Sequence, residues 1–134
     1  MGARLRVLGL LATAALLGAA AQPAAAQQRW AAIDPNSEAS SPVAWGATEE
    51  EARQRAMEAC KRVSKTCANG PASTNDMREV FALMCCEQPK LGCVAGAAAG
   101  RREAMRSAQR MLADAGYSNC SVRHYLSAGT GKRQ

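Results

Sequence analysis

The segment GATEEEARQRAMEAC, residues 46–60, decides how this chain folds, because it predicts where a helix begins and which side of it is buried. Thr48, followed three residues later by Glu51, forms a capping box of the kind that commonly starts a helix. Consecutive glutamates then place negative charge at the positive end of the helix. Helical spacing of the small and apolar residues predicts one buried face made of Ala52, Ala56, Met57, Cys60 and Val63.

The pattern around this helix occurs twice in the chain. An aromatic-led apolar run, a second apolar run, a Glu-Ala helix and a cysteine follow one another in the same order in both halves. At offsets of 51 to 53 residues, the matches pair residues 30–33 with 81–84, 43–46 with 94–97, 51–56 with 103–108, and Cys67 with Cys120. We therefore predict two tandem ββα-type repeats, over about 30–68 and 80–123, each closed by a return strand.

The predicted fold class is α+β, with antiparallel strands packed against two helices and stapled by disulfides. We expect strands over 30–33, 43–47, 80–86, 93–98 and 120–126, and a second helix from about Arg101 to Ala115 that Gly116 ends. Residues 69–75 have the composition of a linker between the repeats, and residues 128–134 that of a flexible tail. One small domain would span residues 27–127.

The first 26 residues read as a secretory signal. Two arginines precede an uncharged run from Val7 to Ala21, and Ala24-Ala25-Ala26 offers the small residues at which a signal peptidase cleaves. The run is shorter than the roughly 20 apolar residues of a membrane-spanning helix. We expect cleavage before Gln27, a mature charge of +6 − 2 = +4, and no membrane span after cleavage. The Ala- and Arg-rich composition suggests a bacterial protein of the periplasm or the exterior.

Six cysteines, at positions 60, 67, 85, 86, 93 and 120, lie in the mature part of the chain. Only twenty large apolar side chains accompany them, which is a thin core for an independent domain. An even cysteine count in a small exported chain favours structural disulfides, each worth roughly 2–4 kcal/mol. The spacings do not fit the paired C-x2-4-C pattern of zinc sites. Thiol chemistry at the neighbouring pair Cys85-Cys86 stays open as an alternative.

Six cysteines allow 15 disulfide connectivities, and the sequence does not select one. Geometry favours a bond between Cys60 and Cys67, which would clip the end of the helix to the segment that follows it. Cys93 would bond to one of the pair Cys85-Cys86 and so link the second hairpin, and Cys120 would take the other.

The start Trp30-Ala-Ala-Ile33, the segment 46–60 and the cysteine seven residues later resemble a family of small exported bacterial proteins, known as domain of unknown function 4189. The resemblance covers residues 30–122. It implies export and the twofold strand-helix pattern, and it implies no reaction, substrate or catalytic residue. The second half departs from the pattern, because Leu112 stands where the first half has Cys60.

No combination of residues indicates catalysis, a metal site or a cofactor. His124 is the only histidine, and it lacks a recognisable nucleophile and acid beside it. The run Glu49-Glu50-Glu51 is explained by the start of the helix, and residues 92–100 lack the Lys-Ser/Thr ending of a phosphate-binding loop. Trp30 and Trp45 are expected to anchor the core.

A positive charge along the second helix is the strongest indication of a partner. Four arginines are spaced along one predicted face of that helix: Arg101, Arg102, Arg106 and Arg110. They form either a solvated face or a docking surface for an anionic envelope component or an acidic protein. Nucleic acid is not expected, because export removes the usual targets. The sequence predicts a non-catalytic exported binding module, of which an inhibitor or immunity protein is one version. The alternative is a periplasmic thiol-redox or other envelope enzyme that uses Cys85 and Cys86.

Overall fold

The computed structural model describes residues 29–37, 42–67 and 70–134. The predicted signal segment, residues 1–26, lies outside the described residues. Within the described part, the fold is α+β, as predicted, with two helices and two three-stranded antiparallel sheets. The elements are β1 (Trp30–Ile33), β2 (Val43–Gly46), α1 (Glu49–Lys61), β3 (Ala72–Thr74), β4 (Val80–Gln88), β5 (Gly92–Ala98), α2 (Arg101–Asp114) and β6 (Ser118–Ser127).

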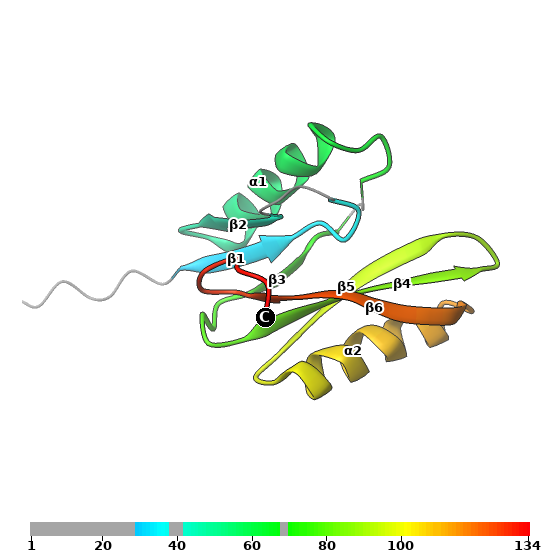
Figure 1. Ribbon diagram of the computed structural model, residues 1–134. Coiled ribbons are helices and arrows are strands. Elements are labelled where there is room, and N and C mark those ends of the chain that lie inside the picture. The colour runs from blue at the N-terminus through cyan, green and yellow to red at the C-terminus, as the bar shows by residue number, and fades with distance from the viewer. Residues whose placement is uncertain (1–28, 38–41, 68–69) are drawn as a thin grey trace, which may run out of the picture.

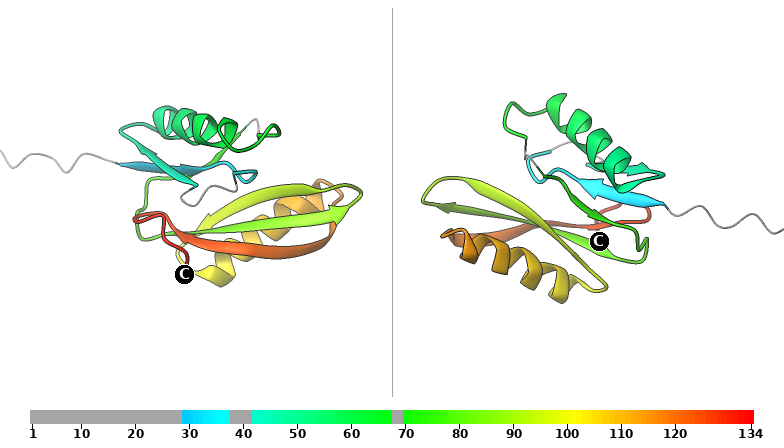
Figure 2. Two further views of the ribbon diagram at one scale, coloured as in Figure 1. Left: turned by 45° about the horizontal axis from the view of Figure 1, so that its top comes forward. Right: turned by 180° about the vertical axis from the view of Figure 1, so that it is seen from behind.

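The helices and sheets form four layers, in the order α1, first sheet, second sheet, α2 (Figure 1, Figure 2). The strand order is β2-β1-β3 in the first sheet and β5-β4-β6 in the second. Alternate side chains of a strand point to opposite faces of its sheet. Ala32 of β1 accordingly packs against α1, whereas Ile33 packs against Phe81 of β4 between the two sheets. Met84, on the other face of β4, packs against Leu112 of α2.

Both helices begin where the sequence predicts, and α2 ends within one residue of the prediction. The predicted buried face of α1 is confirmed at Ala52, Ala56 and Cys60 but is wrong for Val63, which lies beyond the end of the helix and is 53% exposed. The Thr48 hydroxyl accepts a hydrogen bond from the Glu51 backbone N–H at 3.1 Å, which satisfies one of the free donors at the start of α1. Gly116 ends α2 with a φ of +82°, in the left-handed region that glycine adopts without strain. The Tyr117 N–H reaches back to the Leu112 carbonyl at 2.9 Å and closes the last turn.

The segment predicted as a linker, residues 69–75, contains a strand. Ala72–Thr74 form β3, which pairs with β1 in the register Ala31↔Thr74 and completes the first sheet. The three residues of β3 are too few, and too polar, to show the alternation by which a strand is recognised from sequence. The return strand of the first half is therefore this short edge strand.

The segment set apart as a tail, residues 128–134, folds back on β6. Ala128 is fully buried, and Leu126 pairs with Arg133 across the turn. The Ala128 carbonyl also accepts a hydrogen bond of 2.7 Å from the indole nitrogen of Trp45 in the other sheet. Trp45 and Trp30 are both half-buried, so each contributes part of its ring to the packing. The end of the chain thus helps to join the two sheets.

The two sheets differ in length, and the difference leaves a space between them. The strands of the first sheet have three or four residues, whereas those of the second have seven to ten. Phe81, near the start of β4, packs against the first sheet. Leu83 and Cys85, further along the same face of β4, line a cavity instead. The β4–β5 hairpin therefore extends beyond the cover of the first sheet (Figure 1).

Candidate functional site

All six cysteines form disulfides, as predicted. The bonds join Cys60 to Cys67, Cys85 to Cys93, and Cys86 to Cys120. The first is the bond that geometry favoured, and the other two settle the choice that the sequence left open at the pair Cys85-Cys86. No free cysteine is present among the described residues. The neighbouring cysteines take different partners because consecutive residues of a strand point to opposite faces.

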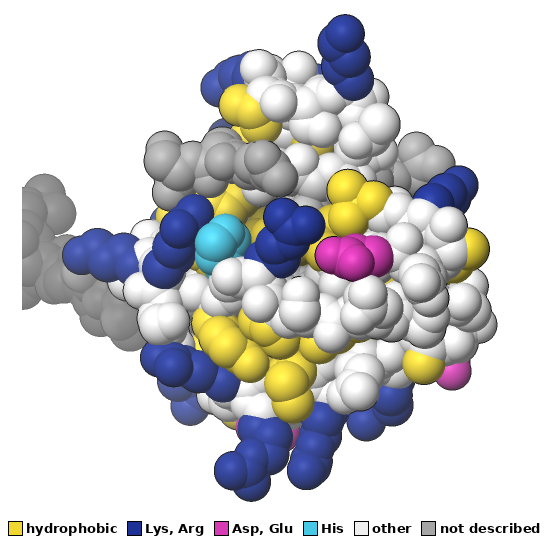
Figure 3. All heavy atoms as spheres, turned by 45° about the vertical axis from the view of Figure 1, so that its right-hand side comes forward, with side chains coloured by type: hydrophobic (Ala, Val, Ile, Leu, Met, Phe, Trp, Pro, Cys, Tyr) yellow, Lys and Arg dark blue, Asp and Glu magenta, His cyan; other side chains and the backbone are white. Residues whose placement is uncertain are grey.

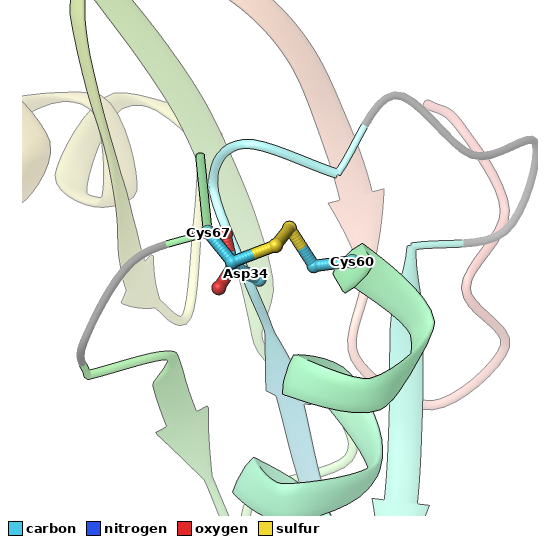
Figure 4. A group of neighbouring side chains, drawn as sticks. All are labelled: Asp34, Cys60 and Cys67. Carbon is cyan, nitrogen blue, oxygen red and sulfur yellow. A yellow bond between two sulfur atoms is a disulfide. The ribbon is translucent and has the colours of Figure 1, made fainter. Parts of the chain in front are cut away.

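One group of potential metal ligands lies together within residues 29–37, 42–67 and 70–134. It consists of Asp34, at the end of β1, and the two sulfurs of Cys60 and Cys67 (Figure 4). The sulfurs are bonded to each other, so neither is a thiolate that could ligate a metal. Asp34 is fully buried and accepts a hydrogen bond of 2.9 Å from the Asn36 backbone N–H. Asp34 therefore lies at the turn that ends β1, and the disulfide anchors the end of α1. Both roles are structural.

The four arginines predicted as a partner surface are all exposed on α2, and the structure divides them into three and one. Arg102, Arg106 and Arg110 follow one another at four-residue spacing. They lie opposite the buried face of the helix, which consists of Ala104, Ala108 and Leu112. Arg101 lies to one side, where its guanidinium carbon is 5.6 Å from the centre of the Tyr125 ring on β6. Arg101 is thus held against the sheet, and the other three form a row facing solvent.

The arginines of this row form no ion pair in the described part of the chain, although α2 also carries Glu103 and, one turn after Arg110, Asp114. The ion pairs found there join Arg53 to Glu49, Arg55 to Glu51, and Arg78 to Asp76, none of them on α2. On α1, the arginines are each paired with a glutamate one turn earlier. The two helices therefore differ in their exposed charge, although both bury an alanine-rich face. We call Arg102, Arg106 and Arg110 the arginine row.

A cavity of about 420 Å³ between the two sheets is the feature that the sequence did not predict. One wall consists of loop residues from the first half, including Asn36, Val63 and Thr66. The other wall and the floor belong to the second sheet and the β4–β5 hairpin, and include Leu83, Leu91 and the Cys85–Cys93 disulfide. The basic side chains Arg123, His124 and Arg133 also line it. We call this cavity the intersheet cleft.

Figure 3 shows the face of the molecule on which the cleft opens. The single histidine, in cyan, lies between Lys or Arg side chains, and hydrophobic side chains lie beside it in the hollow between the two halves. His124, to which the sequence analysis assigns no role, is therefore part of the cleft lining. One acidic side chain is visible nearby, but no Asp or Glu belongs to the described lining.

The sequence contains one weak indication of the cleft, which is the presence of hydrophobic residues inside short loops that cysteines close. Three large hydrophobic side chains are exposed in the described residues: Val63, Leu91 and Met111. Val63 lies within the loop that Cys60 and Cys67 close, and Leu91 lies within the hairpin that Cys85 and Cys93 close. An apolar residue in a short loop whose ends are fixed by a disulfide has no core to enter, so it remains on the surface.

Comparisons with protein-family models, curated proteins and solved structures yielded no match to this chain. None of the helices in the described residues has the length and apolar character needed to cross a membrane.

Proposed function

We propose that this chain is an exported, non-catalytic binding module, which docks through the arginine row of α2 onto an anionic component of the bacterial envelope. The observation that carries the proposal is the row itself. Three exposed guanidinium groups share one helix face and have no ion-pair partner among the described residues. Export through the segment 1–26 belongs to the same proposal, and the three disulfides support an oxidising compartment.

The arginine row is unfavourable for the isolated chain, which supports a role in binding. Like charges four residues apart on a helix repel each other, by about 0.2–0.5 kcal/mol for each pair. Arg101 and Arg102 also place positive charge at the positive end of the helix dipole, beside the single Glu103, whereas α1 begins with three glutamates. An anionic partner would relieve both kinds of repulsion.

The alternative function, thiol-redox chemistry at Cys85 and Cys86, receives no support from the described geometry. Both sulfurs are engaged in disulfides, and the described residues contain no free cysteine that could attack them. We therefore assign the disulfides to the scaffold.

The proposal is tested by the binding of the exported protein to anionic surfaces of two kinds. Vesicles of phosphatidylglycerol present phosphate, and soluble polyglutamate presents carboxylate. We expect binding that weakens as salt is raised, and its loss in the double variant Arg102→Glu/Arg106→Glu. The matched control is Lys61→Glu/Lys65→Glu, which changes the net charge by the same amount at exposed positions away from α2. Equal binding by the two double variants would contradict the proposal.

We also propose that the two halves are copies of one ββαβ unit. The topology supports this, because the first strand of each half lies at the centre of its sheet, between the second strand and the return strand, and a helix follows the second strand in both halves. The buried helix positions correspond at an offset of 52 residues: Ala52 with Ala104, Ala56 with Ala108, and Cys60 with Leu112. Membership of the family of domain of unknown function 4189 stays a prediction from the motif.

A further inference from the structure

The intersheet cleft combines exposed hydrophobic side chains with loops that are closed by disulfides. Two of the three exposed large hydrophobic side chains line it, Val63 at 53% and Leu91 at 65% exposure. They come from opposite halves of the chain, and each lies in a loop whose ends are joined by a disulfide. The ends of both loops are therefore fixed before any ligand arrives, which reduces the entropy that binding would otherwise lose.

The lining of the cleft is partly polar and partly apolar. Leu83 and Leu126 are at most 5% exposed, and the Cys85–Cys93 disulfide lies across the β4–β5 hairpin beside them. The apolar surface that an alkyl chain can contact therefore comes mainly from Val63 and Leu91. At about 420 Å³ the cleft lies within the range of roughly 300–1,000 Å³ that is typical of small-molecule sites.

The charged side chains of the lining indicate which headgroup a ligand with an apolar chain would carry. Arg123, His124 and Arg133 contribute to the lining, and no described Asp or Glu does. Arg123 and His124 each take part in a further interaction as well. Arg133 is exposed, and the pairing of its backbone with Leu126 fixes it at the cleft. A guanidinium group favours a carboxylate or phosphate, which it can bind through two parallel hydrogen bonds.

We infer that the intersheet cleft binds a single-chain amphiphile with one anionic headgroup, of the fatty-acid kind. The alkyl chain would lie between Val63 and Leu91 over the floor of Leu83, and the headgroup would face Arg133 and Arg123. This site is independent of the arginine row, because the cleft and α2 lie on opposite faces of the second sheet. The two proposals can therefore fail separately.

The test is calorimetric titration of the exported, oxidised protein with octanoate, decanoate and dodecanoate, each below its micelle concentration. Because each buried methylene contributes about 0.8 kcal/mol, affinity should rise roughly fourfold for every added methylene. Decyltrimethylammonium has a chain of the same length as decanoate with the opposite charge, and we expect it to bind at least tenfold more weakly. Equal binding of the two headgroups, or no heat with any chain length, would overturn the inference.

Matched variants locate the site. Leu91→Ser should weaken decanoate binding about tenfold or more, whereas Met111→Ser, which removes an exposed hydrophobic side chain outside the cleft, should leave it unchanged. Arg133→Gln should weaken binding by roughly fivefold to tenfold, and Arg110→Gln should not. All four positions are exposed, so the variants should fold. If Met111→Ser or Arg110→Gln weakens binding as much as its cleft counterpart, the ligand binds elsewhere and the assignment is wrong.

Discussion

Cys85 and Cys86 are neighbours in β4, and their disulfides lie on opposite faces of the second sheet. The bond from Cys85 to Cys93 faces the first sheet and lines the intersheet cleft. The bond from Cys86 to Cys120 lies in the cluster that packs against Leu112 of α2. One disulfide therefore braces the hairpin that forms a wall of the cleft, and the other holds β6 against β4 under the helix that carries the arginine row.

We expect the loss of the Cys86–Cys120 bond to destabilise the chain more than the loss of the Cys60–Cys67 bond. The sequence separations are 34 and 7 residues, and a longer closed loop restricts the unfolded chain more. The chain-entropy relation gives roughly 4 kcal/mol for the first and roughly 2.5 kcal/mol for the second. Double alanine variants compared by urea unfolding measure the difference. Cys60 and Cys86 are both fully buried, so the packing lost is similar, and a reversed order would contradict the prediction.

Arg106→Glu is expected to stabilise the protein while it weakens binding to anionic surfaces. The substitution replaces two repulsive four-residue spacings, to Arg102 and to Arg110, with attractive ones. The gain should be about 0.5–1 kcal/mol at low salt, visible as a higher urea midpoint. A serine at the same position should give a smaller gain. If Arg106→Glu lowers the midpoint, the arginine row is stabilising in itself, and the argument that it needs a partner fails.

Gly96→Ala should destabilise the fold by about 1–3 kcal/mol or more, because α2 crosses β5 in direct contact with this residue. A Cβ atom at Gly96 would lie 2.6 Å from the backbone nitrogen of Ala108 and would also clash with the Ala104 carbonyl oxygen. Both are backbone atoms that cannot turn away. Gly70→Ala is the matched control, since a Cβ there has no atom within 4 Å. Thermal melts of the two variants should differ clearly, and similar melting temperatures would refute the close contact.

We expect the stability of the fold to depend on pH through the carboxyl group of Asp76. Arg78 lowers the pKa of the Asp76 carboxyl to about 2, first through its side-chain hydrogen bond and then through its backbone N–H. The guanidinium lies 2.8 and 3.0 Å from the two carboxylate oxygens. Because the folded pKa is below the unfolded value of about 3.9, the carboxylate stabilises the fold above pH 4, and this contribution is lost as the pH falls through 2.

The measurement that checks this is urea unfolding of the wild-type protein and of Asp76→Asn across pH 2–6. The difference between the two should shrink from pH 4 to pH 2, since only the wild type loses a charge at this position. A difference that stays constant over the range would show that Asp76 acts through its shape and hydrogen bonds alone.

The sequence predicts the parts of this fold that depend on local chemistry. Thr48 and Gly116 mark helix ends through hydrogen bonds within a few residues, and Cys60 and Cys67 are close in the chain. A strand over 80–86 also fits separate partners for the two neighbouring cysteines, because consecutive residues of a strand point to opposite faces. In each case the residues that carry the sequence pattern and the residues that they contact are close together in the chain.

The parts that the sequence does not predict depend on distant segments. β3 exists because β1 offers it an edge, and its three residues carry no pattern of their own. The last seven residues fold back because Trp45, 83 positions earlier, donates a hydrogen bond to Ala128. The intersheet cleft results from unequal strand lengths in two sheets, which a single segment cannot indicate. The division of the four arginines likewise depends on Tyr125, a residue of another element.

We propose that the cysteines build a rigid scaffold for binding and perform no thiol chemistry. The mass of the exported protein and of its peptides, after thiol alkylation without reduction, tests this proposal. We predict a chain that begins at Gln27, carries no alkylated cysteine, and yields linked peptides that join Cys60 to Cys67 and the pair Cys85-Cys86 to both Cys93 and Cys120. Alkylation of Cys85 or Cys86 in the exported protein would contradict the claim and would make redox chemistry the leading function.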